Sequence, residues 1–564
     1  MHIRVWKLIE WIRQPQWLSL GVVLVVAMVF SPIYNTNDDV SMARMASGTY
    51  DGIPNQRLVY IHPFYGFILS KLYALFPNIP WYGVASLVIL ALSLYCITRC
   101  IQSRYGTTLV AYVATLYIGS VYAVAVLFVQ YTAIASLAGM SGCVALCCGA
   151  IAPRGAPRHS FALGAVLVVA SLLLRENAFL YTAALALPLM LYALCTAPSK
   201  AQRRTLGMYL GGIVVLYVVL RASSAFVYAQ SDDWKEYMHW SSVQAYYHAY
   251  DIVNYEKNKE YYSTLGWSEN DYTMLTTWFY TDEQRFSTEA VAGVLTSALK
   301  KNLSREGVFF TLNTLAKQLS EYSLELLIFL EFQLFIFVSV VRKKGRLFAY
   351  GSLLVLGALL MLYLAFLGRQ LPSRFVYPLL LTISIYGLYL FPQDSNNDTF
   401  SSKGIAILCA VPMIFFVVQW AAFARLNDVR IAQYAAILSS LPKGKLIFNW
   451  DSSLPMHWTS IFDTLHDYRE RDIAGNGWPQ RSPYDRALFA KYGIHDVYSD
   501  AVDNPNVYLV ALPEYLEILK KYLAEHYHKE VRVIVDRSFD VRDDGLSPPL
   551  LHTAQLVRLQ SVQR

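Results

Sequence analysis

The sequence is dominated by apolar runs, each about as long as the roughly 20 residues that a membrane-spanning helix needs. Hydrophobic residues make up 55% of the chain and charged residues only 15%, whereas a soluble domain carries about 25% charged residues. The length of 564 residues alone would suggest several soluble domains. The composition excludes that interpretation and predicts a polytopic membrane protein that is mainly α-helical.

Eleven of these runs are interpreted as spans, which makes the fold class a transmembrane helical bundle. They cover residues 17–34, 82–100, 108–127, 131–150, 161–175, 178–196, 206–222, 322–341, 347–367, 374–391 and 404–423. Basic residues gather in every second loop, which the positive-inside rule places in the cytoplasm. They are Arg4, Lys7 and Arg13; Arg99 and Arg104; Arg154 and Arg158; Lys200, Arg203 and Arg204; Arg342, Lys343, Lys344 and Arg346; and Lys403.

This charge pattern predicts a multi-pass protein of the inner or plasma membrane, with a cytoplasmic N-terminus and an extracytoplasmic C-terminus. We expect a transmembrane domain over residues 1–423 with two long outer loops, 35–81 and 223–321. The second loop is rich in Tyr and Trp, a composition that suits either stacking on sugar rings or a helix bundle resting on the membrane. Its later half is predicted to be helical.

The tail, residues 424–564, changes character and predicts a small exterior α/β domain. FARLNDVRIAQYAAILSSL has the period of an amphipathic helix, and PEYLEILKKYLAEHY predicts another helix. KGKLIFNW, VYLVAL and KEVRVIVD are typical of strands. The tail shows no nucleophile elbow, phosphate-binding loop or HExxH motif.

Two further properties of the chain exclude other classes of protein. The formal net charge of +7 comes from the short basic loops, so nucleic acid is not an expected partner. All seven cysteines fall inside apolar runs, so neither a disulfide framework nor a cysteine zinc site is expected.

The first outer loop carries two adjacent carboxylates, Asp38 and Asp39, directly after the first span. Acids so close to a membrane are costly unless they face water, a partner or a substrate. We expect a short helix from Asp38 to Ser47, with Asn35 or Asn37 as the N-cap and Gly48 as its stop. An ionised Asp at such a helix N-terminus suits a general base, and the pair is equally compatible with a divalent cation.

Cationic residues near the outer boundary are candidates for binding a phosphate. Arg175, followed by Glu176, lies at the turn between the fifth and sixth predicted spans, and a guanidinium there suits a lipid phosphate. Arg369 and Arg374 frame the next candidate loop, where two cations suit a phosphate or pyrophosphate. Further polar residues of the first loop, more typical of structural roles when taken singly, are Arg57 and His62.

Several of these segments together resemble a known superfamily. They are Asn37-Asp38-Asp39, Ser47-Gly48-Thr49-Tyr50, the run FILSKLYALFPNIPWYG, Arg175 and the loop GRQLPSR. Over residues 15–423 the chain resembles the GT-C superfamily of integral-membrane glycosyltransferases, in a family-39-like form, which take sugars from polyprenyl-phosphate donors such as undecaprenyl phosphate sugars. The resemblance implies that Asp38 or Asp39 is the catalytic base or a metal ligand. It also implies donor-phosphate contacts from Arg175, Arg369 and Arg374.

The expected function is therefore a hexosyl- or pentosyltransferase that inverts the anomeric centre, with a glycan, lipid or protein as acceptor. One alternative is a glycan polymerase or ligase that uses a polyprenyl-pyrophosphate oligosaccharide and depends on arginines rather than on a first-loop acid. Another is a transporter or flippase, which would have polar residues near mid-membrane and related halves.

Overall fold

The fold is described from a computed structural model of the chain. The residues described are 15–105, 109–151, 158–249, 253–302, 305–341, 344–367, 371–390, 399–475, 477–543 and 550–562. The described chain is mainly helical, and its only sheet of more than two strands within these ranges lies near the C-terminus.

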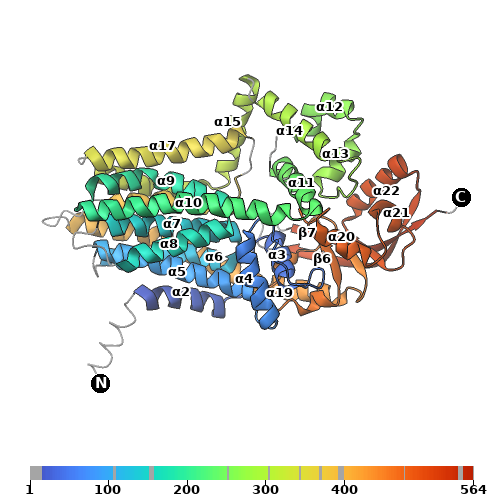
Figure 1. The fold of residues 1–564 in the computed structure, drawn as a ribbon, viewed down its shortest axis with the longest axis horizontal. Helices are drawn as coiled ribbons and strands as arrows, with labels where there is room; N and C mark the ends of the chain where they lie inside the picture. Colours follow the sequence, from blue (N-terminus) through green and yellow to red (C-terminus); the bar gives the residue numbers. More distant parts are fainter. Residues whose placement is uncertain are drawn as a thin grey trace.

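Long helices run side by side through one half of the molecule (Figure 1), and each of the eleven predicted spans falls on one of them. They are α2 (Pro15–Val29), α5 (Trp81–Tyr105), α6 (Leu109–Leu127), α7 (Tyr131–Ile151), α8 (Arg158–Leu174), α9 (Glu176–Thr196), α10 (Lys200–Ala229), α16 (Ser323–Val340), α17 (Lys344–Phe366), α18 (Ser373–Leu390) and α19 (Thr399–Ser440). Helix α7 is buried along almost its whole length because α5, α8, α9, α10 and α18 all pack against it.

Six helices in the described part of the chain are long and apolar enough to cross a membrane, as expected of an integral membrane protein. They are Trp81–Arg104, Tyr131–Ile151, Glu176–Thr196, Lys200–Ala229, Lys344–Phe366 and Ser373–Leu390. Shorter apolar helical segments occur at Ser19–Val29, Ala114–Leu127, Ser160–Leu174 and Phe329–Val338. The count of eleven spans and the orientation of the termini stay predictions.

The first outer loop forms the predicted short helix, α3 (Asn37–Ser47), which ends at Gly48 in the left-handed conformation (φ 75°). The predicted N-cap is wrong, because the cap position is taken by Thr36. The loop continues into a second helix, α4 (Pro63–Leu75). Just before α3, β1 (Ile33–Tyr34) pairs in parallel with β2 (Phe128–Val129) and so ties the loop to the end of α6.

The described part of the second outer loop is mainly helical, with an irregular segment at 277–287. Its helices are α11 (Asp232–Ala249), α12 (Tyr255–Thr264), α13 (Glu269–Thr276), α14 (Thr288–Asn302) and α15 (Arg305–Ser320). Rings such as Trp240, Tyr262 and Tyr280 are buried in its core. These rings therefore pack the protein interior and are unavailable to stack on a sugar. The loop lies beside the C-terminal part of the chain (Figure 1).

The tail forms a five-stranded sheet in the order β4-β3-β5-β7-β6. The strands are β3 (Leu446–Asn449), β4 (Asp472–Gly475), β5 (Val507–Ala511), β6 (Val531–Asp543) and β7 (Leu550–Ser561). Strands β3, β4 and β5 run parallel, whereas β7 is antiparallel to β5 and β6. The tail also contains the helices α20 (Pro483–Ala490), α21 (Val497–Asp500) and α22 (Pro513–Tyr527). It has two short 3-10 turns, η2 (Met456–Trp458) and η3 (His466–Arg469).

The strands expected in the tail and the helix α22 are present, whereas β4 and β7 were not predicted. The last predicted span and the amphipathic helix after it form one helix, α19, of 42 residues. At 1.5 Å per residue it is roughly 63 Å long, about twice the thickness of a bilayer core. Its C-terminal half therefore extends beyond the span and reaches the sheet, against which it packs through β6.

Candidate active site

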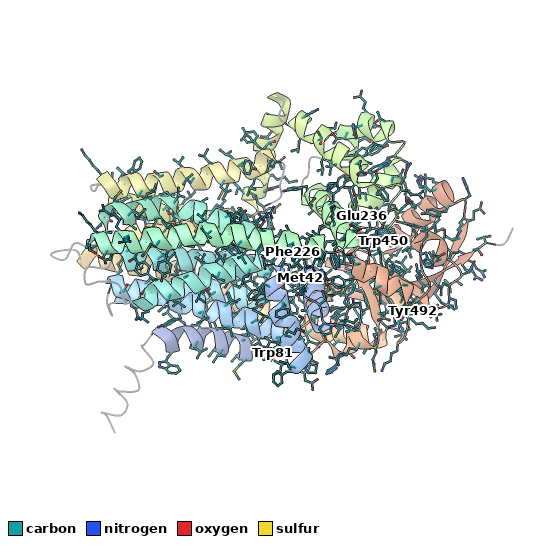
Figure 2. The ribbon with its side chains drawn as sticks, viewed as in Figure 1. Met42, Trp81, Phe226, Glu236, Trp450 and Tyr492 are labelled. Atoms are coloured by element: carbon teal, nitrogen blue, oxygen red, sulfur yellow. The ribbon has the colours of Figure 1, made fainter. Side chains whose placement is uncertain are left out.

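The two carboxylates of α3 lie where the helical bundle meets the tail. Figure 2 places Met42, on the same helix, between the bundle and the sheet. Asp38 and Asp39 occupy the first turn of α3, where backbone N–H groups and the helix dipole favour a negative charge. Although they are neighbours in sequence, they have different environments.

Asp39 is fully buried, and its carboxylate is completely engaged by protein groups. Oδ1 accepts hydrogen bonds from the Tyr82 hydroxyl at 2.9 Å and from the backbone N–H of Tyr131 at 3.1 Å. Oδ2 accepts one from the Thr36 hydroxyl at 2.8 Å. Burial raises the pKa of Asp39 from 3.8 to about 7, in spite of these donors. Asp39 therefore joins α3 to the starts of α5 and α7, and a substrate would have to displace these bonds to reach it.

Asp38 is only partly buried and has one hydrogen-bond donor among the described residues, the Trp478 indole N–H at 3.1 Å from Oδ1. Burial raises the pKa of Asp38, and the charge of Arg374, the Trp478 hydrogen bond and the charge of Arg175 each lower it. A base needs an accessible lone pair and must be ionised. Asp38 meets the first condition better than Asp39 does, and the cations favour the second.

The two predicted phosphate ligands Arg175 and Arg374 come together beside Asp38 from different helices. Arg175 is the N-cap residue of α9, and its guanidinium lies over the rings of Tyr60 (4.9 Å) and Tyr131 (5.6 Å). Arg374 is in the first turn of α18 and is partly buried. Both charges act on the carboxylate of Asp38. Arg369, the other predicted ligand, lies outside the described residues.

A cavity of about 530 Å³ adjoins this group. Apolar residues of α6, α7 and α19 line it, including Val121, Val124, Ala125, Ala133, Leu137 and Phe423. Polar and charged side chains also line it, among them Gln130, Arg374, Arg430, His457, Asp543 and His552. Arg374 thus faces both the cavity and Asp38. His457 provides a second link, because its backbone N–H donates to the Asn37 side chain at 2.9 Å.

The remaining predicted site residues, Glu176, His62 and Arg57, make contacts with groups other than Asp38. Glu176 forms an ion pair with Arg221 on the outer surface of α10. The ring of His62 caps α4, since its Nδ1 accepts from the Phe64 N–H at 3.1 Å and its Nε2 lies 2.9 Å from the Leu220 carbonyl oxygen. Arg57 lies over the ring of Trp234 at 5.5 Å.

These positions suit structural roles for Glu176, His62 and Arg57. Burial lowers the pKa of His62, which keeps the cap neutral near pH 7. The capping role of His62 could have been predicted, because Pro63 directly after it is a local signal of a helix start. The partners of Glu176 and Arg57 come from later helices and have no such local signal.

The sequence analysis missed two residues that shape the site, Trp478 and His457. Both come from the tail, more than 400 positions from α3. Neither belongs to a recognisable motif, so no local signal identifies them.

A metal at the Asp-Asp pair would need further ligands. Within the residues that the structure describes, no group of three or more His, Cys, Asp or Glu side chains could hold a metal ion. The neighbours of Asp38 are instead two guanidinium groups, which suit an anion.

Comparisons with known proteins give one distant likeness. No protein-family model matches the chain. No curated protein sequence matches it either. Among solved structures it is similar to the crystal structure of ArnT from Cupriavidus metallidurans bound to undecaprenyl phosphate, with 13% identity and a TM-score of 0.41 over 97% of this chain and 98% of that chain. A likeness this distant assigns neither family nor function, so the function rests on the residues of the site.

Proposed function

We propose that the protein is a membrane glycosyltransferase that moves a sugar from a polyprenyl-phosphate-linked donor to an acceptor hydroxyl at the outer face of the membrane. Asp38 is the general base, and Arg374 and Arg175 hold the donor phosphate. The observation that carries the proposal is the partly buried Asp38 carboxylate, on which two guanidinium charges act, beside a cavity lined by Arg374 and by apolar side chains of the bundle. The apolar side chains suit the prenyl chain, and Arg374 suits the phosphate.

The reaction follows from these positions. Asp38 takes the proton of the acceptor hydroxyl as its oxygen attacks the anomeric carbon, and the bond from that carbon to the phosphate oxygen breaks. The prenyl phosphate leaves with its negative charge held by the arginines, so the site needs only one base. A direct displacement of this kind inverts the anomeric centre. Electrostatic stabilisation of charge that develops on the leaving group is a major source of catalysis.

The test is sugar transfer by the purified full chain in lipid vesicles. A panel of radiolabelled polyprenyl-phosphate monosaccharides is compared with a polyprenyl-pyrophosphate oligosaccharide. Turnover of a monophosphate donor that depends on Asp38 supports the proposal. If only the pyrophosphate donor is used, and Asp38→Asn does not affect its use, the polymerase or ligase alternative replaces it.

Arg374→Ala is expected to weaken donor binding, raising the donor KM by roughly 10- to 100-fold, because a charged hydrogen bond contributes about 1.5–3 kcal/mol. The acceptor KM should change little. Arg221→Ala is the matched control. The Arg221 side chain is two-thirds exposed, and its ion pair is with Glu176. An unchanged donor KM in Arg374→Ala would remove this arginine from the phosphate site.

Chelator is expected to leave turnover of the wild-type protein unchanged, because the described residues offer no metal-ligand cluster beside Asp38. The measurement is the initial rate before and after EDTA treatment, followed by addition of Mg²⁺ or Mn²⁺. Loss of activity on chelation and its recovery with one of these ions would assign Asp38 to a metal rather than to proton transfer.

A further inference from the structure

Trp478 lies in the loop between β4 and α20, and it is the point at which the tail reaches the proposed base. Its indole N–H donates to Asp38 Oδ1 at 3.1 Å, and its side chain is buried. No described residue donates to Oδ2 of the same carboxylate. One oxygen of Asp38 is therefore fixed while the other stays available.

The second outer loop holds Trp478 in place. The Tyr237 hydroxyl, on α11, donates to the Trp478 carbonyl oxygen at 2.5 Å. The preceding residue, Gly477, has a φ of 99°, which favours glycine, and its carbonyl oxygen accepts from the Tyr280 hydroxyl at 2.7 Å. The edge of the indole meets the ring of Tyr60, with centroids 5.1 Å apart. The indole is thus fixed from the first loop, the second loop and the tail.

We infer that Trp478 is a positioning residue for the transfer reaction, which orients the Asp38 carboxylate and favours its ionised form. This inference rests on the proposed function. A hydrogen bond to a carboxylate stabilises its charged form, and a carboxylate with one oxygen fixed presents the other in a defined direction. The base is then completed only when the tail and the second outer loop are both docked on α3.

Other charged groups near Asp38 also affect its ionisation, in addition to the hydrogen bond from Trp478. Arg374 approaches from α18 and Arg175 from the start of α9, and Asp39 follows on α3 itself. The uncharged phenols of Tyr60, Tyr131 and Tyr280 also lie near Asp38. Removal of the indole N–H leaves all of these groups in place, so its effect is separable from theirs.

The experiment compares Trp478→Phe with Trp450→Phe. Trp450 is a buried tryptophan of the same part of the chain, and its indole N–H donates to the Thr277 carbonyl oxygen at 2.8 Å. Both substitutions therefore remove one buried indole hydrogen bond, but only one of these bonds is to Asp38. We expect Trp478→Phe to lower kcat roughly tenfold and to move the acidic limb of the kcat/KM profile up by about one pH unit. Trp450→Phe should leave that limb in place.

A second readout needs no substrate. Asp38 is labelled with a water-soluble carbodiimide and an amine across a pH series, and the peptide ending at Arg44 is analysed by mass spectrometry. The labelling midpoint of Asp38 should rise in Trp478→Phe and stay constant in Trp450→Phe. Tyr237→Phe, which removes an anchor of Trp478 and keeps the indole, should give a smaller rise.

The two readouts separate the inference from the proposed function. An unchanged labelling midpoint and an unchanged acidic limb in Trp478→Phe would overturn the positioning role. If no donor is used by the wild-type protein but the midpoint still rises, the contact with Asp38 stands and the transferase proposal fails. If Trp478→Phe does not fold, Tyr237→Phe decides the matter by the same two measurements.

Discussion

Asp38→Asn is expected to lower kcat/KM for sugar transfer by roughly 10²- to 10⁴-fold, the usual contribution of a general base. The amide cannot accept the proton of the acceptor hydroxyl, but it has the same shape and can still accept the Trp478 hydrogen bond. The fold and donor binding should therefore remain. The measurement is the rate of transfer at matched protein levels, together with the melting temperature in detergent.

Asp39→Asn is the matched comparison on the neighbouring residue, and its effect should be mainly structural. Asp39 accepts three hydrogen bonds, including one from the backbone N–H of Tyr131. An Asn at this position brings an N–H₂ group toward some of those donors, so we expect a lower melting temperature. Transfer that survives in Asp39→Asn and is lost in Asp38→Asn assigns the base to Asp38. The opposite result would mean that Asp39 leaves its buried position during the reaction.

The pH dependence of the wild-type protein gives a further check on the same assignment. Burial raises the pKa of Asp38 above the ordinary value of 3.8. A base works only when ionised, so kcat/KM should fall as the pH drops through this raised pKa. The acidic limb should therefore lie at a higher pH than that of an ordinary aspartate, and Asp38→Asn should abolish it.

Local signals in the sequence explain which parts of the site could be predicted. Asp38 and Asp39 were placed in the first turn of a short helix because Gly48 marks its end and the first span marks where the loop begins. The N-cap of α3 could not be predicted, because the side-chain oxygen of Asn37 accepts a hydrogen bond from the backbone N–H of His457 instead of capping the helix. That partner lies 420 positions away and belongs to no motif.

The prediction of two separate elements, a last span and an amphipathic helix after it, was wrong because they form the single helix α19. A change from an apolar run to an amphipathic pattern suggests a new element, but a helix ends only where the backbone has a reason to stop. Between Met413 and Ser440 the chain has neither Pro nor Gly, so the helix continues from one environment into the next. Arginine clusters such as Arg175 and Arg374 were found from their position at span ends, whereas the partners of Glu176, Arg57 and His62 depend on packing that the sequence does not show.

The second large effect is expected at the ion pair that docks the sheet of the tail on α19. Arg430, on α19, donates two hydrogen bonds to Asp543 Oδ1, at 2.7 and 3.2 Å, and one to Oδ2 at 3.0 Å. Both side chains are about nine-tenths buried. Arg430 also donates to Asn427, whose amide lies 3.5 Å from the Leu127 carbonyl oxygen of α6.

Arg430→Ala is expected to destabilise the docked state by about 3–5 kcal/mol, because it breaks a buried ion pair and removes three charged hydrogen bonds from the Asp543 carboxylate. The measurement is the rate at which protease releases the tail from protein in vesicles, together with the melting temperature. Arg558→Ala is the matched control in the same sheet, since its pair with Asp536 is much more exposed and such pairs contribute about 0–1 kcal/mol. Equal effects of the two substitutions would contradict a docking role for Arg430.

The double variant Arg430→Met/Asp543→Leu distinguishes two roles of the ion pair. One is holding the sheet against α19, and the other is placing charges at the cavity. Replacing both partners of a buried pair with apolar residues of similar volume is often neutral or stabilising, so protease resistance should return. Because Trp478 and His457 reach α3 only from the docked tail, recovery of docking should restore Asp38 as a base. If transfer also returns, the pair contributes by holding the tail. If transfer stays absent while docking returns, the charges of the cavity wall take part in binding the substrate.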